Sequence, residues 1–293
     1  MKVGIVGLGE AGAAMTEALL REGHAVCCHD DRLSSSTIAT AGRLAIPCFA
    51  AASQFADAVE IVLVTVQASK AQELAVRLVP ALRVGTIYAD CTAKSVEARD
   101  AIARTCSDRA LAFCDIAIAD TVSWPDRTVE LLASGAGTNA IASLFTGTRF
   151  LVRIVDAIRP VSAELKLLRS VYTKGLTALI LETLCAAQKC GTRDEIQRSV
   201  TSFMQEDFSR IASMLVGSSI KHARRRADEM RDARRLLDGL LGCAPMTAAT
   251  SAVLDGIAQA GLTSPADTLE SVIEELHRSQ VFHRMSDAAI ANH

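Results

Sequence analysis

Three glycines near the N-terminus are spaced for binding a phosphate. Gly7, Gly9 and Gly12 form a G-x-G-x-x-G pattern between an apolar, β-branched run and a segment of helix length. In such a strand–turn–helix unit the first glycine permits the tight turn, the second lets the backbone approach a pyrophosphate, and the third lets the helix pack on the strand. The N–H groups at the helix N-terminus would then bind the phosphates. The pattern predicts a dinucleotide site built on Gly7, Leu8, Gly9, Glu10, Ala11 and Gly12.

Two acidic residues follow the next apolar run, where such a unit needs an acid for the ribose. Asp30 and Asp31 come about 20 residues after the glycines. A carboxylate there accepts hydrogen bonds from the ribose hydroxyls and repels a 2′-phosphate, so we predict NAD as the cofactor. Arg32 could neutralise such a phosphate, which leaves NADP as an alternative. Val66 and Thr92, which lie at or just after later apolar runs, are the remaining predicted cofactor contacts.

The elements that must position these residues are short apolar runs that alternate with segments of helix length. The apolar runs cover residues 2–6, 25–29, 60–66, 86–90, 110–118, 129–134 and 150–155, and the helical segments cover 11–22, 69–82 and 95–105. This alternation predicts a parallel sheet that is covered by helices on both faces. The later runs lie closer together, so we expect the sheet to finish with antiparallel strands, of which 150–155 is the last.

The pattern changes after Pro160. Residues 161–190 are predicted to form one long helix, and helical patterns punctuated by glycine and proline continue to the end of the chain. We therefore predict an α/β Rossmann-like N-terminal domain over residues 1–158 and an all-α C-terminal domain over residues 159–293.

The composition excludes several classes of protein. The 293 residues are 50% hydrophobic, and 31 basic residues against 33 acidic ones give no general field for a nucleic acid. The longest uncharged stretch, residues 131–148, contains Gly, Ser, Thr and Asn, which argues against a membrane span. The nine cysteines include no C-x-x-C pair or metal-ligand spacing. We expect buried thiols, no metal, and a cytoplasmic protein without a leader.

The chain resembles the β-hydroxyacid dehydrogenase family, which includes 3-hydroxyisobutyrate dehydrogenase and 6-phosphogluconate dehydrogenase. The resemblance is carried first by GLGEAGAAMTEALLREGHAV. Two later segments, ELKLLRSVYTKGL and HARRRADEM, are more similar to an uncharacterised branch of phosphogluconate dehydrogenase-like proteins. The resemblance extends over the whole chain and implies a Rossmann-like domain, a long linking helix, and a C-terminal domain like that of 6-phosphogluconate dehydrogenase. The long apolar helix suggests a surface buried against a second copy of the chain, so we expect a homodimer, and the resemblance implies that the helical domains make its contacts.

The same resemblance implies a catalytic residue. Oxidation of an alcohol requires a base for the hydroxyl proton, and the catalytic lysine of the family matches Lys166. Three leucines beside it suggest partial burial. One turn later Ser170 stands where the family has a substrate-binding asparagine, and Lys174 is an alternative amine or a further anion contact. Thr92 keeps one hydroxyl of the family's D-x-S-T motif, so it is expected to contact substrate as well as cofactor.

The substrate loop of the family is not preserved. Its S-G-G motif is replaced by Ala119-Asp120-Thr121, where a carboxylate would repel that of a substrate. We therefore expect an anionic substrate other than 3-hydroxyisobutyrate, bound by a cation from elsewhere. His222 and Arg226, in a segment rich in arginine, are the candidates, although such a segment is equally typical of a solvated helix face.

The leading functional hypothesis is an NAD(P)-dependent oxidoreductase. It would transfer hydride between nicotinamide and a small anionic β-hydroxy acid, with Lys166 as general acid/base. Two alternatives remain open: an imine or keto-acid reductase on the same scaffold, and an NAD(P)-binding sensor that has lost catalysis.

Overall fold

The computed structural model describes the chain except for residues 121, 125–126, 263–267, 284 and 286–293. The described residues divide into two compact units, 1–171 and 172–293. The division falls inside helix α7 (Ser162–Lys189), which closely matches the long helix predicted over 161–190. The predicted domain boundary, after residue 158, lies just before this helix, but the helix up to Val171 packs with the first unit.

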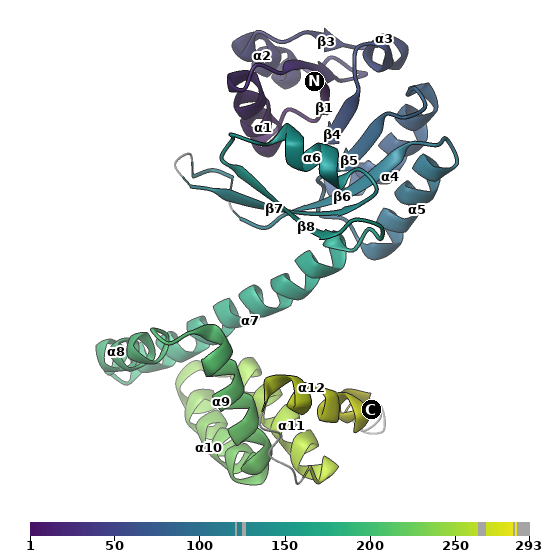
Figure 1. The fold of residues 1–293 in the computed structure, drawn as a ribbon. Coiled ribbons are helices and arrows are strands. Elements are labelled where there is room, and N and C mark those ends of the chain that lie inside the picture. Colours follow the sequence, from purple (N-terminus) through teal and green to yellow (C-terminus); the bar gives the residue numbers. More distant parts are fainter. Residues whose placement is uncertain (121, 125–126, 263–267, 284, 286–293) are drawn as a thin grey trace. The chain divides into compact units, whose positions relative to one another are not determined.

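An eight-stranded sheet forms the frame of the first unit, in the order β3-β2-β1-β4-β5-β6-β7-β8 (Figure 1). The strands are β1 (Lys2–Val6), β2 (Ala25–His29), β3 (Cys48–Phe49), β4 (Ile61–Val64), β5 (Ile87–Asp90), β6 (Ala112–Ile118), β7 (Val129–Gly135) and β8 (Phe150–Asp156). The helical segments are α1 (Glu10–Arg21), α2 (Ser35–Leu44), α3 (Ala52–Asp57), α4 (Ala68–Leu78), the 3₁₀ turn η1 (Val79–Ala81), α5 (Val96–Ser107) and α6 (Thr138–Leu144). The strands from β3 to β6 all pair in parallel.

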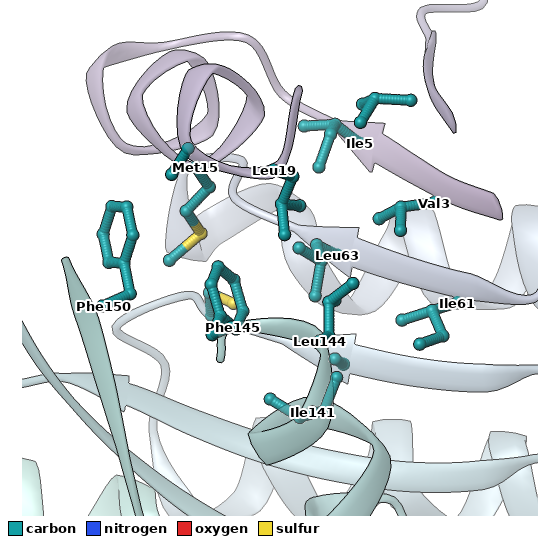
Figure 2. Packing of buried hydrophobic residues seen from close by; sticks show 14 of the residues in the cluster. Val3, Ile5, Met15, Leu19, Ile61, Leu63, Ile141, Leu144, Phe145 and Phe150 are labelled. Carbon is teal, nitrogen blue, oxygen red and sulfur yellow. The ribbon is translucent and has the colours of Figure 1, made fainter. Parts of the chain in front are cut away.

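Both faces of the sheet are buried. Because successive side chains of a strand point to opposite faces, Ile5 and Leu63 pack on one side and Val6 and Val64 on the other. On the first side, shown in Figure 2, the side chains of α1 and α6 and of Phe145 and Phe150 cover the strands. On the second side α3, α4 and α5 do so. The predicted Rossmann-like sheet with two covered faces is confirmed.

The end of the sheet differs in part from the prediction. Strands β6 and β7 are antiparallel as expected, but β7 and β8 pair in parallel. The reason is α6, an unpredicted short helix that carries the chain back to the starting edge of β7, so that β8 runs in the same direction. The short elements α2, β3 and α3 were also missed, because their apolar patterns are too brief to be distinguished from loops.

The second unit is helical, which confirms the predicted all-α C-terminal region. After the remainder of α7 come α8 (Arg193–Phe203), α9 (Phe208–Lys221), α10 (Ala223–Leu241), α11 (Pro245–Ala260) and α12 (Leu269–Arg278). Gly242 ends α10 with a φ of +86°, and Pro245 begins α11. The buried carboxylate of Glu182 accepts the N–H groups of Met246 and Thr247, each at 2.9 Å, and so caps α11. Within the described part of the chain, no helix is long and apolar enough to cross a membrane.

Candidate functional site

The glycine turn between β1 and α1 has the geometry that its sequence predicts. Gly7 has a φ of +100°, and a Cβ atom there would lie 2.9 Å from the backbone of Thr65 and Val66. A Cβ atom on Gly12 would lie 2.0 Å from the carbonyl oxygen of Gly7. Helix α1 can therefore approach the turn this closely only because residue 12 has no side chain. Around Gly9, by contrast, no described residue other than the immediate chain neighbours has an atom within 4 Å of such a position. The middle glycine therefore leaves its backbone open to a ligand.

A cavity of about 620 Å³ lies beside this turn, at the carboxyl ends of β1, β2 and β4. Six of the predicted cofactor residues line it: Gly7, Leu8, Gly9, Asp30, Asp31 and Val66. The remaining turn residues, Glu10, Ala11 and Gly12, form the first turn of α1. The N-cap residue of this helix is Gly9, which has no side chain to accept its first N–H groups, so these groups are available to a phosphate. The donor set and the open backbone fit a dinucleotide.

Asp30 organises the end of the cavity where a ribose would bind. Its carboxylate accepts the N–H groups of Arg32 (3.0 Å) and Ser34 (3.2 Å) and the hydroxyl of Ser34 (2.6 Å). Burial by itself would raise the pKa of Asp30, but the hydrogen bonds from Ser34 and Arg32 lower it to about 2. Asp30 is therefore ionised at neutral pH and holds the loop after β2 in place.

The second acid is also engaged by the protein. Asp31 forms an ion pair with Arg77 of α4, and Arg32 and Lys70 line the same cavity. Three cations thus share the ribose end of the cavity with the two carboxylates from which we predicted NAD. The preference for NAD over NADP stays a prediction.

A buried cluster of charges follows β5 and was not predicted. Lys94 Nζ lies 2.8 Å from Asp115 Oδ1 and 3.4 Å from Asp90 Oδ1, and none of the three side chains is more than 1% exposed. Burial raises the pKa of Asp90, whereas the ammonium of Lys94 acts in the opposite direction. Thr92 lies buried in this cluster and donates its N–H to Asp90 Oδ1 at 2.8 Å. Its hydroxyl oxygen has no hydrogen-bond partner among the described residues.

The same cluster fixes the start of α7. Asp115 Oδ2 accepts the N–H of Ala163 at 2.8 Å. Ser134, which pairs with Asp115 across β6 and β7, accepts the N–H groups of Val161 (2.8 Å) and Ser162 (2.9 Å) through its hydroxyl. These side chains satisfy N–H groups that a helix start leaves without intrahelical partners. The beginning of α7 is therefore fastened to the middle of β6.

A second attachment holds α7 two turns later. Arg169 donates hydrogen bonds to the carbonyl of Ala119 and to Asp120 Oδ1, the latter at 3.3 Å. Lys166 is half-buried and lies in the helix between these two attachments, which are made to Asp115 of β6 and to Ala119 at the carboxyl-terminal part of β6. Because β6 is parallel to β5, β4 and β1, this part of the strand lies at the same edge of the sheet as the glycine turn.

The residues near Lys166 on α7 differ in how far they are buried. Ser170 is half-buried one turn beyond Lys166, and Lys174 is exposed. The leucines beside the lysine, which suggested a buried setting, are exposed by 36% (Leu165), 46% (Leu167) and 67% (Leu168). Of the replaced substrate loop, Thr121 lies outside the described residues.

The repulsion expected from Asp120 is offset by a cation that the sequence analysis missed. Arg169 neutralises this carboxylate across 49 residues of sequence. The signal available in advance was its spacing of three residues from Lys166, which places both side chains on one helix face.

The arginine-rich helix α10 belongs to the second unit. Arg226 donates to the hydroxyls of Ser218 and Ser219, at 2.6 Å each, and so fastens α10 to α9. His222 is exposed between these helices. Arg225 and Glu229 form the i,i+4 ion pair expected of a solvated face. Anion binding by His222 and Arg226 stays a prediction.

Comparison with known proteins agrees with the geometry. Residues 2–139 match the family model of the NAD binding domain of 6-phosphogluconate dehydrogenase, and residues 187–257 match a domain of unknown function, DUF1932. The chain is 23% identical over 237 residues to an uncharacterized 28.5 kDa protein of Methanothermus fervidus, covering 81% of this chain and 91% of that protein.

Two solved structures have a similar fold. One is a conserved protein of unknown function that is described as structurally similar to 3-hydroxyacid dehydrogenases. It is 26% identical, with 88% of this chain and 97% of that chain covered and a TM-score of 0.61. The other is an imine reductase from Aspergillus terreus in complex with NADPH4 and a dibenzazepine. It is 14% identical, with 93% and 98% covered and a TM-score of 0.76.

Proposed function

We propose that the protein is an NAD(P)-dependent oxidoreductase, because residues 2–139 match the family model of the NAD binding domain of 6-phosphogluconate dehydrogenase. It transfers hydride between nicotinamide and the carbinol carbon of a small anionic β-hydroxy acid, with Lys166 as general acid/base. The observation that carries the proposal is the position of Lys166 on the part of α7 that is fastened along β6. This part of the strand shares an edge of the sheet with the nucleotide cavity.

Each part of the site has its own role in this proposed reaction. The open backbone at Gly9 and the N-terminus of α1 bind the diphosphate, and Asp30 accepts hydrogen bonds from the ribose. The nicotinamide ring, when bound, supplies the hydride acceptor. The neutral amine of Lys166 takes the hydroxyl proton as the carbinol carbon loses its hydride, and the ammonium returns a proton in the reverse direction.

Two hydroxyls orient the substrate in this proposal. Thr92 follows β5, and its hydroxyl oxygen has no hydrogen-bond partner in the part of the chain that the structure describes. Ser170 lies one helical turn after Lys166, on the same face of α7. Both can donate to or accept from a small polar substrate. Their positions on a strand end and on an anchored helix would hold the reacting carbon near Lys166.

Lysine replacement tests the proposal. Purified Lys166→Ala should lose activity by about 10²-fold or more, because general acid–base catalysis typically contributes that much. Lys174→Ala is the matched control, since it removes an exposed amine from the same helix. NADH absorbance with a panel of short β-hydroxy acids is the readout. Turnover that survives in Lys166→Ala and fails in Lys174→Ala would transfer the role to Lys174. Wild-type reduction of cyclic imines without oxidation of any hydroxy acid would favour an imine reductase instead.

The proposal includes a homodimer in the cytoplasm. Within the first unit α7 exposes Leu168 (67%) and Val171 (73%), and within the second it exposes Leu181 (58%). Apolar side chains this exposed along one helix favour burial against a second copy of the chain, and a two-fold dimer is the commonest closed assembly. The nine cysteines are free thiols, which supports a reducing compartment.

A further inference from the structure

The end of β6 carries an ion pair whose position suggests a second role in the site. We propose that Arg169 binds the carboxylate of the substrate while Lys166 serves its hydroxyl. The inference rests on the proposed function for the location of the substrate. It names the residue that recognises the substrate's charge, and it makes a carboxylate separated from the carbinol carbon by one carbon the required feature of the ligand.

The guanidinium of Arg169 is held at a defined place. One terminal nitrogen donates to the backbone carbonyl of Ala119, and the other lies 3.3 Å from Asp120 Oδ1. Asp120 is itself held, because its Oδ2 accepts the N–H of Glu130 at 3.2 Å. The strand end therefore fixes the arginine head group, and less rotational freedom must be lost when a ligand binds.

Arg169 nevertheless faces solvent. Its side chain is 50% exposed and that of Asp120 is 43% exposed, so a small anion can approach the guanidinium. Arg99, which also meets the start of α7, differs in this respect. Its side chain is only 6% exposed and is engaged by Glu164 and Asp100, as expected for a residue that holds α5 to α7. Arg169 thus combines a fixed head group with access from outside.

The spacing between Arg169 and Lys166 suits a β-hydroxy acid. Residues three apart on a helix share a face, with about 5–6 Å between their Cβ atoms. A β-hydroxy acid carries its hydroxyl and its carboxylate on carbons separated by one carbon. A substrate of that length can place its hydroxyl at the lysine and its carboxylate at the arginine.

This arrangement also gives the negative charge of Asp120 a role. Alone it would repel a substrate carboxylate, but its ion pair with Arg169 offsets that repulsion. A guanidinium has five N–H donors and can bind two carboxylates in its plane, which an ammonium cannot do. Asp120 therefore orients Arg169 and, through its own charge, limits how tightly the substrate is held.

Binding measurements on the holoenzyme test the inference. The probes are 3-hydroxypropanoate, 3-hydroxybutanoate and their neutral primary amides, titrated calorimetrically into protein saturated with NADH. The wild-type protein should prefer acid over amide, and Arg169→Met should weaken acid binding by about 10-fold with less than about 2-fold change for the amide. The affinity of Arg169→Lys for the acid should fall between those of the wild-type protein and Arg169→Met. Asp120→Asn, which keeps an acceptor for the arginine, should tighten acid binding. Arg83→Met, which breaks an exposed ion pair with Asp57, is the matched control and should change nothing.

The outcomes separate this inference from the proposed function. Equal acid binding by Arg169→Met and the wild-type protein would overturn the inference. The inference would also be overturned if the wild-type protein bound acid and amide with equal affinity, or bound neither. If acid preference depends on Arg169 but no hydroxy acid reduces NAD or NADP, the proposed reaction is wrong and the carboxylate site stands.

Discussion

Lys94 Nζ lies 2.8 Å from one oxygen of Asp115, and the other oxygen of Asp115 accepts the N–H of Ala163 at the start of α7. A single buried carboxylate thus joins the segment after β5 to the helix that carries Lys166. The contact is remote from solvent, with both charged side chains 1% exposed. It explains how a lysine on a long helix can be held beside the edge of the sheet.

Removing Lys94 should destabilise the protein strongly. Lys94→Met leaves Asp90 and Asp115 buried without their cation, and the loss of one partner of a buried pair typically costs about 3–5 kcal/mol. Urea unfolding followed by circular dichroism measures the change. Adding Asp115→Asn to Lys94→Met should recover part of the loss, because it removes one of the unpaired charges. A loss below about 1 kcal/mol for Lys94→Met would contradict this role.

The hydrogen bonds of Asp30 should make stability depend on pH at the acid end. The pKa of this group is lowered from 3.8 to about 2, so the folded protein binds its proton less readily than the unfolded chain. The stabilisation is therefore fully present above pH 4 and is lost as the pH falls from about 4 to about 2. The difference in unfolding free energy between the wild-type protein and Asp30→Asn should shrink over that interval. A difference that stays constant from pH 5 to pH 2 would argue against these bonds.

We expect NAD to bind more tightly than NADP, because two carboxylates stand at the ribose end of the cavity. Asp31→Asn removes one of these charges and releases Arg77, so selectivity for NAD should fall by about 10-fold. Calorimetric titration of both cofactors measures it, with Asp57→Asn as a control that removes an exposed acid from another ion pair. Tighter NADP binding by the wild-type protein would mean that the positive charges of Arg32, Lys70 and Arg77 outweigh the two carboxylates at the ribose end of the cavity.

Light scattering should give twice the mass of one chain. Leu181→Asp should shift the protein towards monomer, because it places a charge on the exposed apolar surface of α7. Val84→Asp is the matched control, since Val84 is a 78% exposed apolar residue in a turn of the first unit. A wild-type monomer at micromolar concentration, or equal behaviour of the two variants, would count against a dimer through α7.

Local patterns in the sequence were enough to predict a nucleotide site and the class of fold. The glycine turn, the acids after β2 and the long helix all follow from neighbouring residues, because turn conformation, strand alternation and helix periodicity are local properties. The direction of β8 already lay beyond such patterns, since it depends on the short helix α6.

Which charged side chains form ion pairs depends on contacts between residues that are distant in the chain. Lys94 contacts Asp115, which lies 21 residues later in the sequence, and Asp120 contacts Arg169, which lies 49 residues later. The first contact depends on where β6 lies beside β5 in the sheet, and the second depends also on where the start of α7 is attached. Neither follows from the spacing of the partners in the chain. The carboxylate expected to repel the substrate is for that reason neutralised by an arginine that the sequence alone did not connect with it.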